Sequence, residues 1–410
     1  MITTPPTILL SMGTRPEIIK MAPVYLELKQ RGVKPLLLHT GQHSDIASSL
    51  YELFGMEPDY HIDLKRSAEN GVAANGSNEP RANDLAELGS KLLLECSAVL
   101  ERVNPSMVLV HGDTSSALMM ALAAYYHKCK VAHVEAGLRS HDEYHPFPEE
   151  KNRVIIGQLA HWHFAPTQRA RNNLVAEGIH DRSIYVVGNT VVQATQLGAD
   201  RLEAHRKKIN STAEDLLDKL SKKSAGKRIV LVTTHRRENL KSGIGEIAAS
   251  VLQLLELHKD MIIVWPVHPN PKVMAAIKDE IGQVSGELAE RLYLTKPLDY
   301  PVLLWVLKHS WVVLTDSGGI QEEAAALGTP VLVLRQTTER PELIEVGAGA
   351  LVGADTDRIL ATVETLSQNP NQYAAMKNAP NPFGDMTVAH TICNVLLGAD
   401  RRPDSQGAIA

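Results

Sequence analysis

The sequence predicts an α/β protein with two parallel, doubly wound sheets, one in each of two domains. The chain has 410 residues, and a single hydrophobic core stops growing at roughly 250–300 residues, so we expect two domains. Short apolar runs alternate with amphipathic stretches from end to end, the pattern of strands joined by helices in parallel sheets. Only 4% of residues are aromatic, so Leu, Val, Ile and Ala must form the cores, which suits strands buried on both faces.

The apolar runs fall into two series, and each run has the length of a strand. Helical patterns lie between them, and they include 85–103, 115–127 and 244–258. The expected strands of the first series are Ile8–Ser11, Leu36–His39, Met107–Val110, Val131–Val134 and Ile184–Val187. Those of the second series are Ile229–Val232, Met261–Val264, Trp311–Leu314 and Val331–Leu334.

A polar stretch, 199–227, separates the two series, and we place the domain boundary just before it, near residue 195. The tail after Leu397 is polar and rich in small residues, and we expect residues 398–410 to be flexible.

Charge and cysteine content exclude several classes of protein. The net charge is −5 and the basic residues form no long run, so we expect neither nucleic acid nor a membrane surface as a partner. Three widely separated cysteines without a CxxC pair predict reduced thiols rather than a disulfide framework or a cysteine zinc site. No signal-like segment or membrane-length apolar run occurs, so we expect the protein in the cytoplasm.

Most of the expected strands end in glycine mixed with ionisable side chains. In open α/β sheets, ligands bind at the carboxyl ends of the strands. One such cluster could be a turn with a solvated charge, but clusters in both halves of the chain favour an active site. They are 13–17 (GTRPE), 40–43 (TGQH), 111–114 (HGDT), 135–139 (EAGLR), 234–238 (THRRE), 268–270 (HPN) and 316–319 (DSGG).

The DSGG cluster leads into a helical pattern at 320–327 and is a candidate diphosphate site. Glycines let a ligand approach the backbone, and a helix N-terminus presents N–H groups to an anion. The competing interpretation is a turn in which Asp or Ser caps the helix. Glu322 and Glu323, on the first turn, are candidates to bind ribose hydroxyls, or they serve only to interact with the helix dipole.

The sequence gives no support for a redox cofactor, ATP or a metal. No GxGxxG follows the first strand of either series, and no GxxxxGK[ST] occurs. The 17 histidines fit no zinc pattern such as HExxH. Carboxylates follow the strands of the first series at Asp113, Glu135 and the pair Glu149–Glu150, and the pair opens a helix whose dipole favours ionised side chains. With His235 they would supply acid–base groups.

Taken together, these motifs resemble the non-hydrolysing UDP-N-acetylglucosamine 2-epimerases, over about residues 7–397. The matching segments are GTRPEIIKMAPV (13–24), TGQH (40–43), HGDTSSAL (111–118), HVEAGLRS (133–140), PFPEEKNR (146–153), VGNTVVQA (187–194), TTHRREN (233–239), PVHPNP (266–271), LTDSGGIQEEAAALGTPVLVLRQTTERPE (314–342) and NPFGD (381–385).

The resemblance implies a glycosyltransferase-B-like fold of two Rossmann-like domains, with the active site in the cleft between them. The first domain would be 1–195 and the second, UDP-binding domain 196–385, with a C-terminal helix at 386–397 that packs back on the first domain. It also implies a homodimer and a UDP-sugar substrate, without a cofactor.

The implied reaction interconverts UDP-GlcNAc and UDP-ManNAc. UDP is eliminated across C1–C2 to give 2-acetamidoglucal, then added back while a proton is delivered to the opposite face. Carried over by motif, the catalytic group would be Asp113, Glu135, Glu149 and His235, with Asp113 or Glu149 as the base for the C2 proton and His235 near the leaving phosphate. The groups that hold UDP would be Arg15, Ser317, Gly318, Gly319 and Glu323, assisted by Lys20.

The chain departs from the family pattern in the segment 44–47 (SDIA), and its stretch 64–85 is longer and more polar. Gln42, His43 and Arg236 match parts of the site where a second UDP-GlcNAc activates bacterial members. The departures leave open a related substrate, such as a UDP-diacetamido-sugar uronate. The sequence also leaves open a hydrolysing epimerase, a glycosyltransferase of the same fold and a non-catalytic UDP-sugar sensor.

Overall fold

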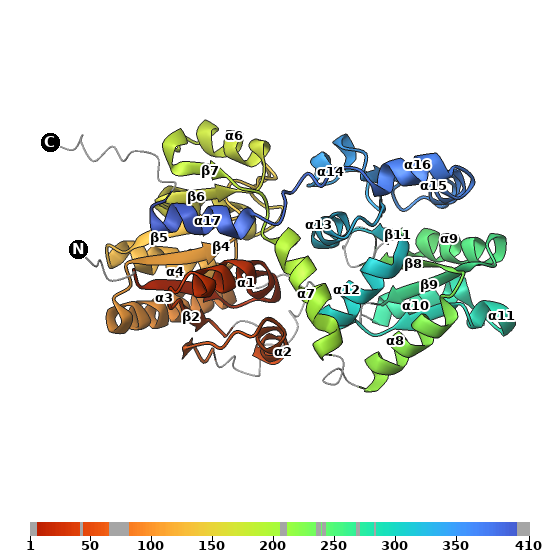
Figure 1. The fold of residues 1–410 in the computed structure, drawn as a ribbon, viewed down its shortest axis with the longest axis horizontal. Helices are drawn as coiled ribbons and strands as arrows, with labels where there is room; N and C mark the ends of the chain where they lie inside the picture. Colours follow the sequence, from red (N-terminus) through yellow and green to blue (C-terminus); the bar gives the residue numbers. More distant parts are fainter. Residues whose placement is uncertain are drawn as a thin grey trace. The chain divides into compact units, whose positions relative to one another are not determined.

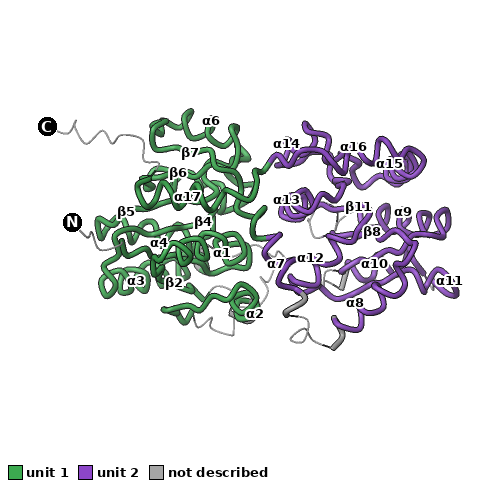
Figure 2. The backbone as a smooth tube through the Cα atoms, in the orientation of Figure 1, with its two compact units in different colours: residues 1–194, 383–410 green, residues 195–382 purple. Residues whose placement is uncertain are grey.

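A computed structural model describes residues 6–41, 44–64, 82–205, 211–234, 239, 243–267, 271–282 and 284–399. The chain divides into two compact units (Figure 2). Unit 1 comprises residues 1–194 and 383–410, and unit 2 comprises 195–382. Each unit contains one parallel sheet with helices, as Figure 1 shows. The predicted fold class, two parallel α/β sheets, is therefore confirmed.

In the described part of unit 1, seven strands form a sheet in the order β3-β2-β1-β4-β5-β6-β7, and all neighbouring pairs are parallel. The central strands β1 (Ile8–Met12) and β4 (Met107–His111) are buried at every position, which explains their continuous apolar runs. The other strands are β2 (Leu36–His39), β3 (Tyr60–His61), β5 (Lys130–Val134), β6 (Trp162–Ala165) and β7 (Ile184–Val186).

The helices of unit 1 follow the strands in alternation, and the last of them comes from the end of the chain. Helix α17 (Val388–Leu397) packs beside α1 (Arg15–Gln30), and the two are adjacent in Figure 1. The remaining helices are α2 (Ser44–Phe54), α3 (Ala82–Val103), α4 (Ser115–Tyr126), α5 (Glu149–Leu159), α6 (Gln168–Ala176), the short 3₁₀ turn Asp181–Ser183, and α7 (Val191–His205), which crosses into unit 2.

In the described part of unit 2, six strands form a parallel sheet in the order β10-β9-β8-β11-β12-β13. The strands are β8 (Arg228–Thr233), β9 (Met261–Pro266), β10 (Leu292–Thr295), β11 (Ser310–Thr315), β12 (Val331–Val333) and β13 (Gly349–Leu351). The helices are α8 (Ser211–Lys223), α9 (Ile244–Leu257), α10 (Pro271–Ile281), α11 (Gly286–Ala289), α12 (Tyr300–His309), α13 (Gly318–Ala326), α14 (Pro341–Glu345), α15 (Thr356–Gln368) and α16 (Pro370–Lys377).

Two local features differ from the sequence-based expectation. The polar stretch 199–227 contains the end of α7 and all of α8, whose Leu217 and Leu220 are buried, so much of it is amphipathic helix. Helix α13 begins at Gly318 rather than at residue 320, because Ser317 occupies the N-cap position. In the described part of the chain, no helix is both long and apolar enough to cross a membrane.

Candidate functional site

The strand order places the candidate residues of unit 1 at a topological switch point. β1 lies between β2 and β4, so the connections that leave β1 and β4 run to opposite sides of the sheet. Ligand crevices form at the carboxyl ends of strands where this reversal occurs. The GTRPE segment follows β1 and the HGDT segment follows β4, so the two motifs meet at this edge.

Glu17 joins these two motifs. Its Oε2 accepts hydrogen bonds from the backbone N–H groups of Gly13 (2.9 Å) and Thr14 (2.7 Å). Its Oε1 accepts one from the hydroxyl of Thr114, at 2.6 Å, the residue after Asp113. Glu17 is 1% exposed, and it lies in the first turn of α1, where the helix dipole favours a carboxylate. Glu17 therefore fixes the position of Thr14, the neighbour of Arg15, relative to Thr114, the neighbour of Asp113.

Gly13 has no room for a side chain. A Cβ built there would lie 1.8 Å from Oγ1 of Thr40, which itself donates a hydrogen bond of 2.8 Å to Oγ of Ser116. The ends of β1 and β2 and the start of α4 are thus packed against one another. This is a structural reason for glycine at the start of the GTRPE motif.

Glu135 lies just beyond β5 with its backbone in the left-handed region, at φ 63°. A residue other than glycine rarely adopts this conformation, and such strain concentrates at functional sites. The Oε2 atom of Glu135 accepts hydrogen bonds from Nζ of Lys20 and, at 2.7 Å, from Nδ2 of Asn189. Nε2 of His111 is 3.7 Å from the same oxygen. Lys20 thus forms an ion pair with Glu135, and its expected assistance to UDP stays a prediction.

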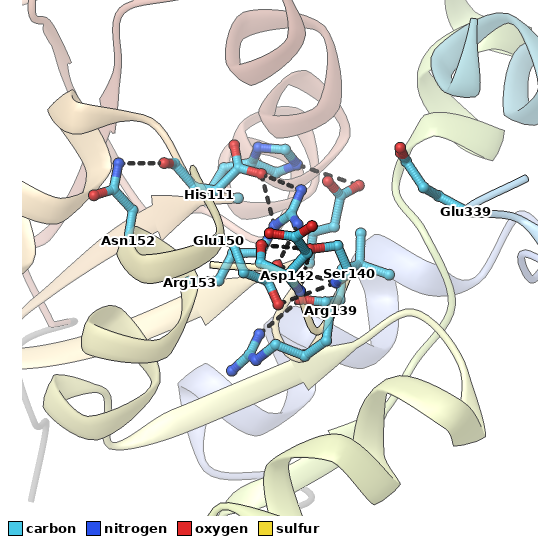
Figure 3. Close-up of polar contacts among 12 residues, drawn as sticks. His111, Arg139, Ser140, Asp142, Glu150, Asn152, Arg153 and Glu339 are labelled. Atoms are coloured by element: carbon cyan, nitrogen blue, oxygen red, sulfur yellow. Dashed lines mark hydrogen bonds and ion pairs between the residues drawn. The ribbon is translucent and has the colours of Figure 1, made fainter. Parts of the chain in front are cut away.

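A second cluster joins Asp113 to the start of α5 (Figure 3). Nε of Arg153 lies 2.8 Å from Oδ2 of Asp113, and Nη1 of the same arginine lies 2.9 Å from Oε2 of Glu150. Nδ2 of Asn152 donates to the backbone carbonyl of Asp113 at 2.8 Å. Arg153 therefore binds two carboxylates from different segments and fixes the position of Asp113 relative to α5.

Glu150 is held as an anion. Burial alone would raise its pKa, but hydrogen bonds from the backbone N–H groups of Ser140 and His141 and from Arg153 outweigh this and lower the pKa. The lowered pKa of Glu150 agrees with the expectation that the start of α5 favours ionised carboxylates.

Glu149 behaves in the opposite way. Burial and the negative charge of Asp113 raise its pKa above the ordinary value. Its Oε2 is buried and has no hydrogen-bond partner among the described residues. For Glu149 the expected effect of the helix dipole is therefore wrong, because desolvation outweighs it. A carboxyl group that keeps its proton to higher pH is suited to acid–base chemistry.

Two histidines of the first sheet, His133 and His163, bind backbone carbonyl groups. Nε2 of His133 donates to the carbonyl of Gly112 at 2.7 Å, and complete burial lowers its pKa to about 3. Nε2 of His163 donates to the carbonyl of Gly157 at 2.8 Å, and burial lowers its pKa as well. Within the described ranges, no group of three or more histidine, cysteine or acidic side chains is arranged to hold a metal ion.

Unit 2 has its own switch point, between β8 and β11. Ser317 follows β11, and its Oγ lies 3.5 Å from the N–H of Ile320, a long capping contact. Gly318 and Gly319 form the first turn of α13, whose leading N–H groups lack partners inside the helix. The preceding residue, Asp316, is fully buried and accepts a hydrogen bond of 2.9 Å from Asn239. This edge combines a rigid turn with backbone donors, as an anion site requires.

The two candidate ribose ligands on α13 differ in their surroundings. Glu322 is 1% exposed, and one of its oxygens is 2.5 Å from Nε of Arg340. It is therefore committed to an internal ion pair. Glu323 is 8% exposed, and its expected role as a ribose ligand stays a prediction.

The structure thus brings Asp113 and Glu149 together, places Glu135 with Lys20, and puts Arg15 at the start of α1. It places Ser317, Gly318, Gly319 and Glu323 at the start of α13. Gln42, His43, His235 and Arg236 lie outside the described residues. Sequence reasoning assigns no role to Glu17, Arg153 or Asn189. Each lies inside a segment that carries the family resemblance, and membership of those segments is the signal that could have found them.

Comparison with known proteins identifies the family. A family model described as UDP-N-acetylglucosamine 2-epimerase matches residues 26–397. The chain is 39% identical to the UDP-N-acetylglucosamine 2-epimerase of Salmonella typhimurium over 92% of this chain and 95% of that protein. It is 38% identical to that of Escherichia coli K12 over 95% of this chain and 98% of that protein.

Solved structures agree with the sequence comparison. The crystal structure of UDP-GlcNAc 2-epimerase from Neisseria meningitidis, bound to UDP-GlcNAc, matches with a TM-score of 0.80 at 37% identity, over 96% of this chain and 100% of that one. The UDP-GlcNAc 2-epimerase from Methanocaldococcus jannaschii matches with a TM-score of 0.78 at 31% identity, over 95% of this chain and 99% of that one. The parallel sheets of both units agree with these matches. The chain therefore belongs to the UDP-N-acetylglucosamine 2-epimerase family of isomerases.

Proposed function

We propose that this protein interconverts UDP-GlcNAc and UDP-ManNAc by the non-hydrolysing route. The observation that carries the proposal is the group of carboxylates at the start of α5, where Arg153 binds both Asp113 and Glu150. In the same place burial raises the pKa of Glu149, and the charge of Asp113 adds to this effect. Neighbouring carboxyl groups in different environments are the usual means by which one site both removes and donates protons.

The chemistry requires such a pair. The C2–H bond of the sugar is not next to a carbonyl, so simple removal and return of the proton is too unfavourable. Instead, a base takes the C2 proton while the C1–O bond to UDP breaks, which gives 2-acetamidoglucal and UDP. In the reverse addition the C1–O bond forms again, and a proton reaches C2 from the opposite face. We assign the proton transfers to the group Asp113, Glu135, Glu149 and His235, with Asp113 or Glu149 as the base.

For UDP we propose the turn of unit 2 and Arg15 of unit 1. The N–H groups of Gly318 and Gly319 would bind the diphosphate, Ser317 would donate its hydroxyl, and Glu323 would accept from the ribose. Arg15 lies in the GTRPE motif at the start of α1. The contact between Lys20 and Glu135 supports a role for Lys20 in holding the carboxylate.

The proposal predicts that UDP-GlcNAc incubated with the protein in D₂O becomes a mixture of UDP-GlcNAc and UDP-ManNAc that carries deuterium at C2. Proton NMR would follow the loss of the C2–H signal and the appearance of the second sugar. A matched reaction with UDP-glucose tests the need for the acetamido group.

Each competing function gives a different result in this experiment. Free ManNAc as the main product would identify a hydrolysing enzyme. Unlabelled substrate with no conversion would remove the elimination mechanism, and a glycosyltransferase or a sensor would then have to be considered. Turnover of a UDP-diacetamido-sugar uronate without turnover of UDP-GlcNAc would keep the reaction and change the substrate.

We further propose that the protein acts in the cytoplasm as a homodimer, and that Gln42, His43 and Arg236 belong to an activating UDP-GlcNAc site. The family resemblance supports these points. Light scattering of the purified protein would test the dimer, and sigmoidal dependence of the rate on UDP-GlcNAc would test the activating site.

A further inference from the structure

Two segments that carry the family resemblance, VGNT (187–190) and NPFGD (381–385), have no part in the chemistry assigned above. In the structure, Gly188 and Asn189 of the first segment lie against Phe383 and Gly384 of the second, all four within unit 1. The first lies shortly before residue 194, where the chain leaves unit 1, and the second contains residue 383, where the chain returns. The contact therefore joins the segment that leads into unit 2 to the segment that returns from it.

Asn189 connects this contact to the proposed active site. Its Nδ2 donates to Oε2 of Glu135 at 2.7 Å, and its Oδ1 accepts from the N–H of Val191 at 3.0 Å. Its own backbone N–H donates to the carbonyl of Phe383 at 2.6 Å. Asn189 is 2% exposed. Hydrogen bonds thus hold both the oxygen and the nitrogen of the side-chain amide, and they orient its NH₂ group towards Glu135.

The backbone contact is made by two glycines in left-handed conformations. Gly188 has φ 93° and Gly384 has φ 107°. A Cβ on Gly384 would lie 3.0 Å from the Cα of Gly188, and a Cβ on Gly188 would lie 2.9 Å from the carbonyl oxygen of Phe383. A side chain at either position would push the segments apart and lengthen the hydrogen bond that Asn189 makes to Phe383.

We infer that Asn189 is a positioning residue, which sets the orientation of the Glu135 carboxylate according to where the segment Phe383–Gly384 lies. The inference rests on the proposed catalytic role of Glu135. The carboxylate also faces Lys20 from α1 and His111 from the end of β4. Those two residues come from the first helix and the fourth strand of unit 1, whereas Asn189 belongs to the segment at which the chain leaves the unit. Asn189 therefore links Glu135 to the connection between the units.

The first test is a double-mutant cycle on the rate of epimerisation. Asn189→Ala should lower kcat by roughly 10- to 100-fold, as expected for loss of a hydrogen bond to a charged group, and should leave the Kd for UDP unchanged. Gly384→Ala should lower kcat in the wild-type protein and have no further effect when Asn189 is already alanine. If the two effects multiply, or if Asn189→Ala has wild-type kcat, the inference is wrong.

Two further variants separate positioning from loss of folding. Gly178→Ala is the matched control for Gly384→Ala, because Gly178 also has a positive φ, 84°, but a Cβ there meets nothing within 4 Å. It should leave kcat unchanged. Asn189→Leu keeps a side chain of similar size and removes the donor to Glu135, so it should reproduce the low kcat even if Asn189→Ala unfolds. A wild-type kcat in Asn189→Leu would refute the role.

A second measurement does not depend on the substrate. The titration of Glu135, followed by the ¹³C NMR signal of its carboxyl carbon, should move to higher pH in Asn189→Ala because the ionised form loses a donor. Gly384→Ala should move it in the same direction, and Gly178→Ala should not. If the wild-type protein fails to epimerise UDP-GlcNAc, the proposed function fails and this titration still decides the positioning role. An unchanged titration in Asn189→Ala would overturn it.

Discussion

Glu149 and Glu150 are neighbours in the chain, but their surroundings shift their pKa values in opposite directions. Backbone N–H groups and Arg153 bind Glu150 and lower its pKa against the effect of burial. Glu149 is buried near Asp113, and both effects raise its pKa. Both residues belong to the first turn of the same helix, so the helix dipole does not explain the difference. The local donors decide which of the two stays ionised.

This contrast predicts opposite effects on stability. The ionised form of Glu149 is disfavoured in the folded protein, so Glu149→Gln should raise the melting temperature at pH 7–8, and the gain should vanish as the pH falls below the ordinary value of 4.5. Glu150→Gln should lower the free energy of unfolding at pH 7 by about 1.5–3 kcal/mol, because it weakens hydrogen bonds to a charged group. That loss should shrink as the pH falls through the lowered pKa of Glu150. Thermal melts from pH 3 to 8 would measure both, and equal shifts of the same sign would contradict the assignment.

Asp113 is the carboxylate whose loss should affect chemistry most directly. We expect Asp113→Asn to reduce exchange at C2 at least about 100-fold, the lower range for a general acid or base, while the Kd for UDP stays unchanged. Asp260→Asn is the control, because Asp260 of unit 2 also pairs with an arginine. Nε of Arg228 lies 2.6 Å from Oδ2 of Asp260. The D₂O assay and calorimetric titration with UDP would compare them. Near-normal exchange in Asp113→Asn would remove it from the catalytic group.

The residues to which sequence reasoning assigns no role share one property, which is a partner far away in the chain. Glu17 accepts from Thr114, 97 residues away. Asn189 donates to Glu135, 54 residues away, and Arg153 binds Asp113, 40 residues away. Motif spacing indicates which strand ends lie near one another, but not which side chains bind there. The candidate site could therefore be located from the sequence, while its internal contacts required the structure.

At the scale of elements, the apolar runs predict the central strands of both sheets. They do not predict some short strands at the sheet edges. β3 has 2 residues and β13 has 3 residues, one of them a glycine. Such segments lack a long apolar run, and they become strands by pairing with a neighbour, as Gly349 does with Val331. β6 (WHFA) is also absent from the expected strands, and it is fixed as a strand by parallel pairing with β5 on one side and β7 on the other. Tertiary contacts decide all three cases.

The start of α13 allows its stabilising and binding roles to be separated. Oγ of Ser317 lies 3.5 Å from the N–H that it caps, whereas Oδ1 of Asn369 lies 3.1 Å from the N–H of Gln372 at the start of α16. We expect Asn369→Ala to lower the free energy of unfolding by about 1 kcal/mol and to leave UDP binding unchanged. Ser317→Ala should cost less stability but weaken UDP binding by about tenfold, the equivalent of one hydrogen bond. Denaturant unfolding and calorimetry would measure the two effects, and equal UDP affinity in both variants would contradict the proposed site.

At the scale of the molecule, unit 1 is built from two stretches of chain separated by the whole of unit 2. Arg31, the residue that caps the C-terminal end of α1, donates a hydrogen bond of 2.7 Å to Asn394 of the returning helix α17. The same helix is tied to the end of the first stretch by one of 2.6 Å from the N–H of Ala389 to Gln193. Its Ile392 and Cys393 are fully buried. The core of unit 1 is therefore complete only when helix α17 is in place.

This arrangement predicts where a mutation near the C-terminus will act. Ile392→Ala should cost about 2–5 kcal/mol, as expected when a fully buried aliphatic side chain is truncated. The loss should appear as faster hydrogen exchange in peptides from α1, and exchange in β8 should stay unchanged. Ile277→Ala, at a fully buried position of α10, is the matched control, and it should accelerate exchange in β8 and leave α1 protected. If Ile392→Ala loosened β8 instead, α17 would be stabilising the unit that precedes it in sequence, and the division of the chain into these two units would be wrong.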